Sequence, residues 1–333
     1  MKAFDYFNLH TNPDLSIISY KDEASWLELR KEGIGGSDVA AVMGLNKYMS
    51  ALKLYKIKTG ALEEDLSDNV FIKKGKDLEY LIRDKYVGPY MYERGYLVRH
   101  PEFMIVNKNV PWLQANVDGI AVPMDETRQH FSENIIIEIK WVSEYAEQNW
   151  FGEDYCGVPA NYYAQVQHYM VVTGAKKAIV CALFDSDWSM HYFEVPYNAA
   201  FVSKLVLESH EFFYGNVRGG IEPKPTPSLD KAWTAEALKK IPDVLEESDE
   251  MTELCAEYQY KKSISKTLSD ECTEMLDKIV QMHLNGKKPV GWKFKITECS
   301  TTTLNTTKLK AERPDIYDNY KQTSVYTRTT IRK

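Results

Sequence analysis

Residues 135–140 read Ile-Ile-Ile-Glu-Ile-Lys, a β-branched run that carries an acid and a lysine two positions apart. Such a run is typical of a strand buried on both faces at the centre of a sheet. Side chains alternate along a strand, so Glu138 and Lys140 share one face and Ile137 and Ile139 the other. A central strand rarely holds bare charges without a partner or a metal ion. A metal site and a plain salt bridge are therefore both open interpretations of this pair.

A second acid precedes the central strand. The segment Leu113-Gln-Ala-Asn-Val-Asp-Gly119 continues as Ile-Ala-Val, which predicts one strand over 112–122 with Asp118 on it. The competing interpretation is a turn, since Asp-Gly pairs favour turns. If the two strands are neighbours, two carboxylates and one ammonium group meet. Such a cluster suits a hard divalent cation beside a proton-handling lysine, a common way to hydrolyse a phosphodiester.

Two predicted helices carry further polar candidates. Glu79 lies on a helix over 70–87, one turn after Gly75, where the missing side chain permits close approach of a backbone or phosphate. Gln165 and His168 lie on a helix that Pro159 opens and that runs to 172. The alternatives are a solvated helix glutamate and an amphipathic helix with polar residues toward water. His168 by itself is more typical of a surface or core histidine than of a ligand.

A glycine-rich turn precedes another helix near the start of the chain. In Gly33-Ile-Gly-Gly-Ser-Asp38, Ser37 is predicted to be the N-cap of a helix to about 43. Backbone N–H groups and the helix dipole at such a turn suit a phosphate, and Gly36 permits close approach. Arg30, just upstream, is placed to add a bidentate contact. A plain loop with a helix cap is the alternative.

Helices thus alternate with strands at about 92–99, 103–107, 112–122, 134–141, 178–184 and 190–195. This order predicts an α/β fold over residues 1–222, a mixed central β-sheet flanked by helices. Residues 223–230 form a proline-rich linker. Residues 231–333 form a helical and small β extension for self-association, partner or DNA contact, with strand-like runs at 291–297 and 326–332. Over 244–284 three- and four-residue spacing predicts a long helix or hairpin, with a possible break near 261–265. Its apolar positions are Met251, Leu254, Tyr258, Leu268, Cys272, Met275, Ile279 and Met282.

Composition narrows the class of protein. The 333 residues are 44% hydrophobic and 27% charged, which is ordinary for a folded soluble chain. No apolar run approaches a membrane span and no signal peptide opens the chain, so we expect no membrane association. Five scattered cysteines without a C-x-x-C pair argue against disulfides, zinc knuckles and iron–sulfur clusters, and indicate a cytoplasmic protein. A net charge of −7 argues against indiscriminate coating of nucleic acid, but not against a cleft that holds a few phosphates.

Taken together, these segments resemble the phage-lambda-type alkaline exonucleases, also called the YqaJ-type viral recombinase family, a branch of the PD-(D/E)xK nucleases. The resemblance covers roughly residues 20–215 and depends on five motifs in order, since each alone is weak. The motifs span residues 30–45, Gly75-Lys-Asp-Leu-Glu79, Ala115-Asn-Val-Asp-Gly119, Glu138-Ile-Lys140 and residues 158–168.

The resemblance implies a PD-(D/E)xK core and a 5′-to-3′ exonuclease that acts on double-stranded DNA ends, releases mononucleotides and leaves a 3′ overhang for strand annealing. It implies that Asp118, Glu138 and the Ile139 carbonyl bind Mg²⁺ or Mn²⁺, with Glu79 completing the site. Lys140 would position or deprotonate the attacking water, and Gln165 would hold that water or the scissile phosphate.

Arg30, Gly36 and Ser37 would bind the 5′-terminal phosphate. By the same resemblance, we expect a homo-oligomer in the form of a trimeric ring, a single-strand annealing protein as partner, and a phage or prophage protein in the cytoplasm of a bacterial host.

Two other functions stay open. An endonuclease on the same fold differs in cutting a covalently closed circle, because an exonuclease needs an end. A DNA-binding assembly protein differs in lacking metal-dependent cleavage altogether.

Overall fold

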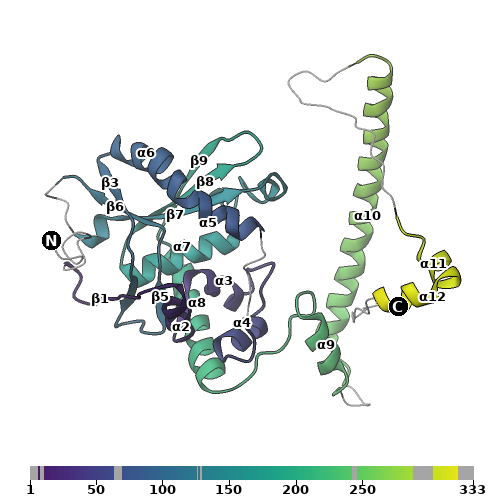
Figure 1. Cartoon of the computed structure of the whole chain (residues 1–333), viewed down its shortest axis with the longest axis horizontal. Helices are drawn as coiled ribbons and strands as arrows, with labels where there is room; N and C mark the ends of the chain where they lie inside the picture. The colour runs from purple at the N-terminus through teal and green to yellow at the C-terminus, as the bar shows by residue number, and fades with distance from the viewer. Residues whose placement is uncertain are drawn as a thin grey trace. The chain divides into compact units, whose positions relative to one another are not determined.

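The computed structural model describes residue 7 and residues 11–63, 70–125, 127, 130–241, 246–287 and 303–321. The chain forms two compact units, Met1–Thr234 and Ala235–Lys333. The first contains two mixed β-sheets flanked by helices, which confirms the predicted α/β class (Figure 1). The proline-rich stretch is held against this unit, because buried Asp230 accepts a hydrogen bond of 2.7 Å from the Ser50 hydroxyl.

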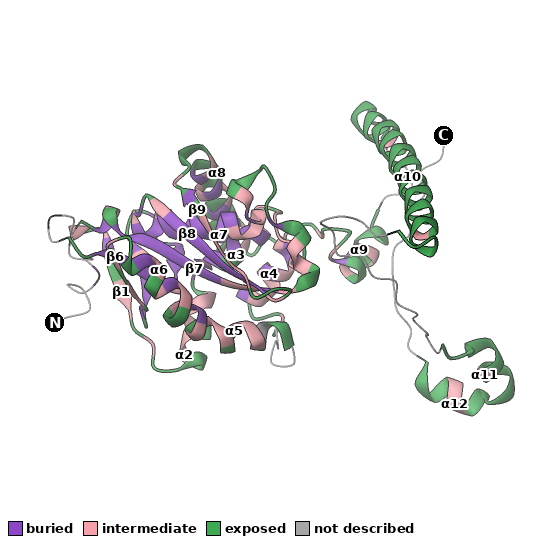
Figure 2. Ribbon diagram, turned by 90° about the horizontal axis from the view of Figure 1, so that it is seen from above, coloured by how far each residue is buried: buried purple, intermediate pink, exposed green. Residues whose placement is uncertain are grey.

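The five-stranded sheet has the isoleucine-rich strand at its centre. Strand β7 (Ile135–Val142) pairs antiparallel with β6 (Gly119–Pro123) and parallel with β8 (Lys177–Phe184). Strand β7 is buried from Ile135 to Ile139, as its run of β-branched residues predicted, and both neighbours are buried over most of their length (Figure 2). The edges are β3 (Tyr96–Arg99) beside β6 and β9 (Met190–Pro196) beside β8.

The predicted strand over 112–122 is wrong, and the error concerns the site. The chain forms β5 (Leu113–Ala115) in a second sheet, leaves it over residues 116–118, and enters the five-stranded sheet as β6. Asp118 therefore lies in a bend between two sheets. The second sheet has the order β1 (Leu15–Ile18), β4 (Met104–Asn107), β5 and β2 (Ile34–Gly35).

Helices cover both faces of the five-stranded sheet. Helix α5 (Val70–Ile82), its π-helical continuation η2 (Arg83–Val87) and α6 (Gly88–Tyr92) bury Ile82, Val87 and Met91 against Ile137 and Ile139. The predicted helix over 70–87 thus changes to π-helical geometry after Ile82, and residues 88–92 are helical where a strand was predicted to begin.

The opposite face packs on α7 (Ala160–Thr173), which begins after Pro159 and ends at Gly174 with φ +83°. Residues from α7 and Ile136 of β7 belong to one apolar cluster. The Glu138 and Lys140 face of β7 is the α7 face.

The other helices of the first unit lie around this core. They are α2 (Glu23–Lys31), α3 (Gly36–Val42), α4 (Ala51–Lys58), η3 (Phe131–Glu133), η4 (Glu144–Asn149), η5 (Tyr155–Gly157), α8 (Ala199–His210) and its continuation η6 (Glu211–Arg218).

His168 of α7 is a core histidine. It is fully buried, and its Nε2 lies 2.9 Å from the Gln114 carbonyl oxygen. Burial lowers the pKa of His168 to about 4.

This shift makes the stability of the protein depend on pH. The unfolded chain binds a proton at His168 below about pH 6.5, whereas the folded chain binds it only near pH 4. The contribution of His168 to stability is therefore complete above pH 6.5 and is lost as the pH falls toward 4. We expect a loss of about 3 kcal/mol, measured by urea unfolding at several pH values, and a flatter profile in His168→Gln. Identical profiles would contradict this role.

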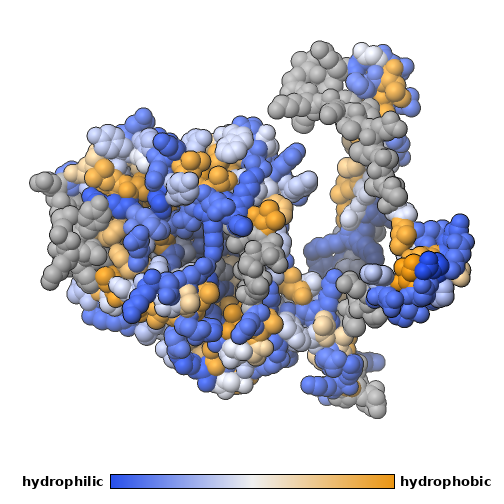
Figure 3. Space-filling model, in the orientation of Figure 1, coloured by the Kyte–Doolittle hydropathy of each residue, from blue (hydrophilic) through white to orange (hydrophobic). Residues whose placement is uncertain are grey.

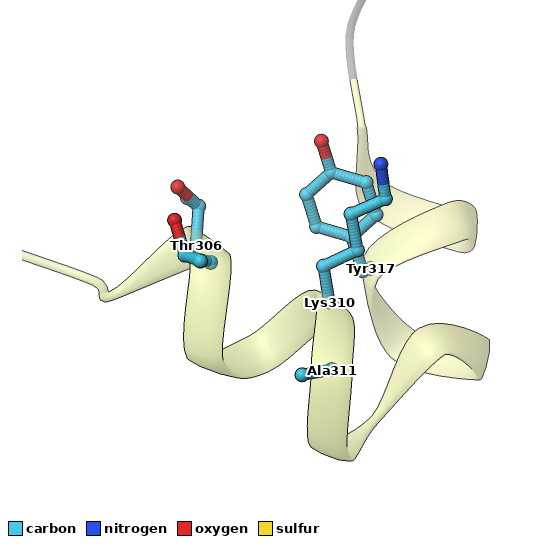
Figure 4. A pocket seen from close by; sticks show the side chains of 5 residues that line it. Thr306, Lys310, Ala311 and Tyr317 are labelled. Atoms are coloured by element: carbon cyan, nitrogen blue, oxygen red, sulfur yellow. The ribbon is translucent and has the colours of Figure 1, made fainter.

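The described residues of the second unit are mainly helical. Helix α9 (Lys231–Leu238) bridges the boundary, and α10 (Asp249–Leu284) runs for 36 residues without the break considered near 261–265. Helices α11 (Thr306–Glu312) and α12 (Pro314–Tyr320) line a shallow pocket of about 460 Å³ with Lys310 and Tyr317 (Figure 4). The strand-like runs at 291–297 and 326–332 lie outside the described residues. No helix among those described is long and apolar enough to cross a membrane.

Candidate active site

Strand β7 supplies two charged side chains to the face that α7 covers. Glu138 is 0% exposed and forms an ion pair with the Lys140 ammonium group. That ammonium group also lies 4.8 Å from the centre of the Tyr162 ring on α7. Strand alternation places both charges on this side, while Ile137 and Ile139 fill the apolar core on the other.

Asp118 reaches the same strand from the bend before β6. Its Oδ2 accepts a hydrogen bond of 2.8 Å from the Ile139 N–H. The β6–β7 pairing ends at Gly119 and Ile137, so the Ile139 N–H lies beyond the paired stretch and is available to a side chain. The Asp118 carbonyl oxygen in turn lies 3.1 Å from His100 Nδ1 and 3.5 Å from Arg83 Nη1. The bend is thus fixed on both sides.

Glu79 comes from α5 and is half-buried. It lies 3.8 Å from Arg83, one helical turn later. Burial and the Asp118 charge together raise the pKa of Glu79 to about 7, against the opposing Arg83 charge. Glu79 and Asp118 are therefore electrostatic neighbours although they come from different elements.

The acids carry more negative charge than the site neutralises. Burial and the Asp118 carboxylate together raise the pKa of Glu138 to about 8, although the Lys140 ammonium group opposes them. Burial also raises the pKa of Asp118, with the Lys140 charge opposing. Three carboxyl groups with raised pKa values around one ammonium group mark a site where additional positive charge is favourable.

A divalent cation fits this donor set. Among the described residues, the Glu138 Oε2 is buried without a hydrogen-bond partner, an uncommon state for a carboxylate oxygen. The same part of the chain contains no group of three or more His, Cys, Asp or Glu side chains already gathered around one point. Glu138 is turned to Lys140 instead. Carboxylate oxygens are the ligands that hard divalent cations prefer.

Gln165 of α7 completes this region. It is buried, and its Nε2 donates a hydrogen bond of 3.0 Å to the Tyr169 hydroxyl. The carboxylates of Glu138 and Asp118 both act on Tyr169, whose pKa is raised well above its usual value, chiefly by burial. Gln165 therefore lies on the same face as the acids.

The predicted phosphate site is a charge cluster in the structure. The Arg30 Nη2 donates to the Ser37 Oγ at 2.9 Å and to the Asp38 Oδ1 at 2.7 Å. Ser37 is not the N-cap that the sequence predicted. Residue Gly35 has that place, and its N–H donates to the Asp38 Oδ2 at 2.9 Å. The Gly35 N–H in the turn is thus bonded to the Asp38 carboxylate of the following helix, and the Ser37 hydroxyl accepts from Arg30 instead.

Lys58 is the residue of this cluster that the sequence analysis missed. It lies at the end of α4, buried, and donates at 2.6 Å to both Asp38 and the Arg30 carbonyl oxygen. Leu54, one turn earlier, is buried as well, so Lys58 continues the buried face of α4. The sequence signal that could have identified Lys58 is its position in line with the apolar residues of this helix.

Gly36 links the charge cluster to the acid face. A Cβ at position 36 would lie 2.6 Å from Cζ of the buried Tyr169 ring. We expect Gly36→Ala to destabilise the protein by about 2 kcal/mol in urea unfolding, because the ring has no room to move. Gly75→Ala in α5 is the matched control: its Cβ meets nothing within 4 Å, so we expect a gain of about 0.5–1 kcal/mol. Equal effects of the two substitutions would contradict the packing role.

Three comparisons place this arrangement among known proteins. Residues 25–176 match the YqaJ-like viral recombinase domain. The uncharacterized protein YqaJ of Bacillus subtilis (strain 168) is 26% identical over 344 residues, which covers 97% of this chain and 99% of that protein.

Solved structures show weaker likeness. LHK-Exo, an alkaline exonuclease from Laribacter hongkongensis, in complex with dAMP, has a TM-score of 0.46 and 20% identity, covering 66% of this chain and 100% of that one. A phage-related exonuclease from Haemophilus somnus 129PT has a TM-score of 0.40 and 12% identity, covering 58% of this chain and 99% of that one. Over residues 25–176, the chain is thus similar to the YqaJ-like viral recombinase domain.

Proposed function

We propose that this protein is a divalent-metal-dependent exonuclease that digests the 5′ strand of duplex DNA ends and leaves a 3′ overhang for recombination by annealing. The match of residues 25–176 to the YqaJ-like viral recombinase domain supports the coarser statement, a nuclease of DNA recombination. The main observation behind the proposal is the hydrogen bond from the Ile139 N–H to Asp118, which fixes a loop carboxylate beside Glu138 and Lys140.

In this proposal Asp118, Glu138, Glu79 and the Ile139 carbonyl would hold Mg²⁺ or Mn²⁺. When bound, such an ion lowers the pKa of water and offsets the charge that builds up on the phosphate. Lys140, which contacts Glu138 and the Tyr162 ring, would orient or deprotonate the attacking water. Gln165, which donates to the Tyr169 hydroxyl on the buried α7 face, would hold that water or the scissile phosphate.

Arg30, Gly36 and Ser37 would receive the 5′-terminal phosphate. The Arg30 side chain is 27% exposed, and among the described residues only its Nη2 is engaged in hydrogen bonds. Arg30 and Lys58 outnumber Asp38, so the cluster has a net positive charge. An anion that approaches Arg30 meets a guanidinium group already oriented by Asp38.

The resemblance stated above extends the proposal to assembly and partners. It adds a ring-shaped homo-oligomer around the product strand, a single-strand annealing protein that receives the overhang, and a bacterial cytoplasm as the place of action.

Linear duplexes labelled at the 5′ or the 3′ end test the reaction, with a covalently closed circle as the endonuclease control. We expect mononucleotides from the 5′ end with Mg²⁺, none with a chelator, and an uncut circle. Cleavage of the circle would show an endonuclease instead of an exonuclease. Absence of cleavage of any substrate in Mg²⁺ and Mn²⁺ would favour a DNA-binding protein without nuclease activity.

Duplexes with a 5′ phosphate or a 5′ hydroxyl test the phosphate site. We expect Arg30→Gln to reduce the preference for 5′-phosphorylated ends by about tenfold or more, the value of a charged hydrogen bond. Lys31→Gln is the matched control, because Lys31 is adjacent and pairs with Glu28 at 2.6 Å. An equal loss on both kinds of end would contradict the assignment.

A further inference from the structure

The position of Arg83 is set by the change from α-helical to π-helical geometry between α5 and η2. Pro89 has no N–H group with which to continue the α-helical pattern, and the Gly88 N–H donates to the Arg83 carbonyl oxygen, five residues earlier. This wide turn keeps Val87 on the buried face of Ile82, from which it would point about 140° away in a regular α-helix. The packing of the core therefore fixes where Arg83 leaves the helix.

The Arg83 side chain is turned toward the acids of the candidate active site. Hydrophilic side chains cover much of α5 on the face that Figure 3 shows, yet the Arg83 side chain is only 17% exposed. Its Nη1 lies 3.8 Å from Glu79 Oε1 and 3.5 Å from the Asp118 carbonyl oxygen. One nitrogen atom thus contacts an acid of α5 and also the bend that carries an acid from a different element.

His100 contacts the same carbonyl oxygen from a third element. Strand β3 pairs Arg99 with Ile120 of β6, so the next residue, His100, arrives beside the beginning of β6. Its Nδ1 lies 3.1 Å from the Asp118 carbonyl oxygen and must carry a hydrogen there, because a carbonyl oxygen only accepts. Residues 116–118 belong to neither sheet, so strand pairing does not hold this bend and side-chain contacts have to do so.

The backbone and the side chain of Asp118 are therefore held separately. Arg83 and His100 contact its carbonyl oxygen, and the Ile139 N–H donates to its carboxylate. We propose that Arg83 and His100 are positioning residues for the divalent cation: both fix the Asp118 bend, and Arg83 also holds Glu79 beside it. The inference rests on the proposed function, since it concerns the cation that these acids would hold. Groups that orient metal ligands affect metal affinity although they do not touch the metal.

The direction of the change in metal affinity distinguishes positioning from simple charge. Arg83 is a cation near a cation site, so its removal would tighten metal binding if its charge alone mattered. If Arg83 holds the ligands in place, its removal weakens metal binding instead. We expect Arg83→Gln to raise the Kd for Mn²⁺ about 10- to 100-fold, the usual effect of losing a group that orients a metal ligand. Isothermal titration calorimetry of the full chain with Mn²⁺ and without DNA measures this change.

Lys85→Gln is the matched control, because Lys85 is an exposed residue of the same π-helix and its loss removes the same charge. This variant should bind Mn²⁺ as the wild type does. Unchanged or tighter binding by Arg83→Gln would overturn the role of Arg83. Wild-type binding that Asp118→Asn abolishes would establish the site, so that such a result would count against this inference alone. A wild-type chain that binds no Mn²⁺ would contradict the proposed metal site and this inference together.

Two substitutions of His100 test the second contact without changing α5. In His100→Asn the side-chain amide still presents an N–H near the place of Nδ1, whereas His100→Leu has no donor. We expect His100→Leu to bind Mn²⁺ about tenfold more weakly than the wild type and His100→Asn to bind it as the wild type does. Thermal unfolding without metal should be the same for both variants, since His100 is exposed. Equal Mn²⁺ affinities of the two variants would overturn the role of His100.

Discussion

The Asp118→Asn variant is expected to hydrolyse DNA at least about a thousandfold more slowly than the wild type. The amide keeps the shape of the side chain and can still accept the hydrogen bond from the Ile139 N–H, so the bend before β6 stays in place. What disappears is one of the negative charges that favour a cation at this site. Mononucleotide release from a 5′-labelled duplex in Mg²⁺ measures the effect.

Duplex binding by the same variant should be retained, because contacts to the phosphate backbone come from separate basic groups. Thermal stability without metal should not fall, since the substitution removes a charge that raises the pKa of Glu138 and Glu79. Asp77→Asn on α5 is the matched control, an exposed acid two residues from Glu79, and should keep activity within about twofold. If the Asp118→Asn variant hydrolysed DNA at a rate within tenfold of the wild type, the assignment of Asp118 to the active site would be wrong.

Asp38→Asn is expected to destabilise the protein by about 3 kcal/mol, because it leaves the adjacent Arg30 and Lys58 charges without their shared partner. Burial alone would raise the pKa of Asp38, but the two cations and the Gly35 N–H outweigh it and hold this pKa below its usual range. Burial lowers the pKa of Lys58, and Asp38 is the group that opposes this. Urea unfolding near neutral pH measures the loss.

A second substitution separates charge from packing. We expect Lys58→Met added to Asp38→Asn to restore a large part of the lost stability, since it removes the uncompensated buried ammonium group. Asp185→Asn, at the partly exposed pair with Lys74 at 3.3 Å, serves as the control and should cost less than about 1 kcal/mol. If Asp38→Asn reduced the free energy of unfolding no more than Asp185→Asn does, the Arg30, Asp38 and Lys58 cluster would contribute no more to stability than an exposed ion pair.

Much of the core follows from local patterns. The β-branched run fixed β7 as a central strand, and the two-residue period placed Glu138 and Lys140 on one face. Pro159 and Gly174 bounded α7. These predictions succeed because they depend on chain geometry within a few residues.

Other features depend on contacts between distant segments. The residues around Asp118 have a strand-like composition, yet the chain changes sheets there, because β5 pairs with β4 and β2 while β6 pairs with β3 and β7. The glycine-rich turn looked like a serine cap, but the helix begins at Gly36, and Asp38, held by Arg30 and Lys58, accepts the hydrogen bond from the Gly35 N–H. No local spacing contains this information.

The sequence by itself determined the α/β class, the central strand and the faces of its side chains, since each follows from backbone periodicity or residue type. Only the tertiary structure decided that Asp118 is fixed to β7 from a bend and that Lys58 joins Arg30 and Asp38. The physical reason is that burial and distance between remote segments set the strength of these hydrogen bonds and charge interactions, and the folded chain alone defines both.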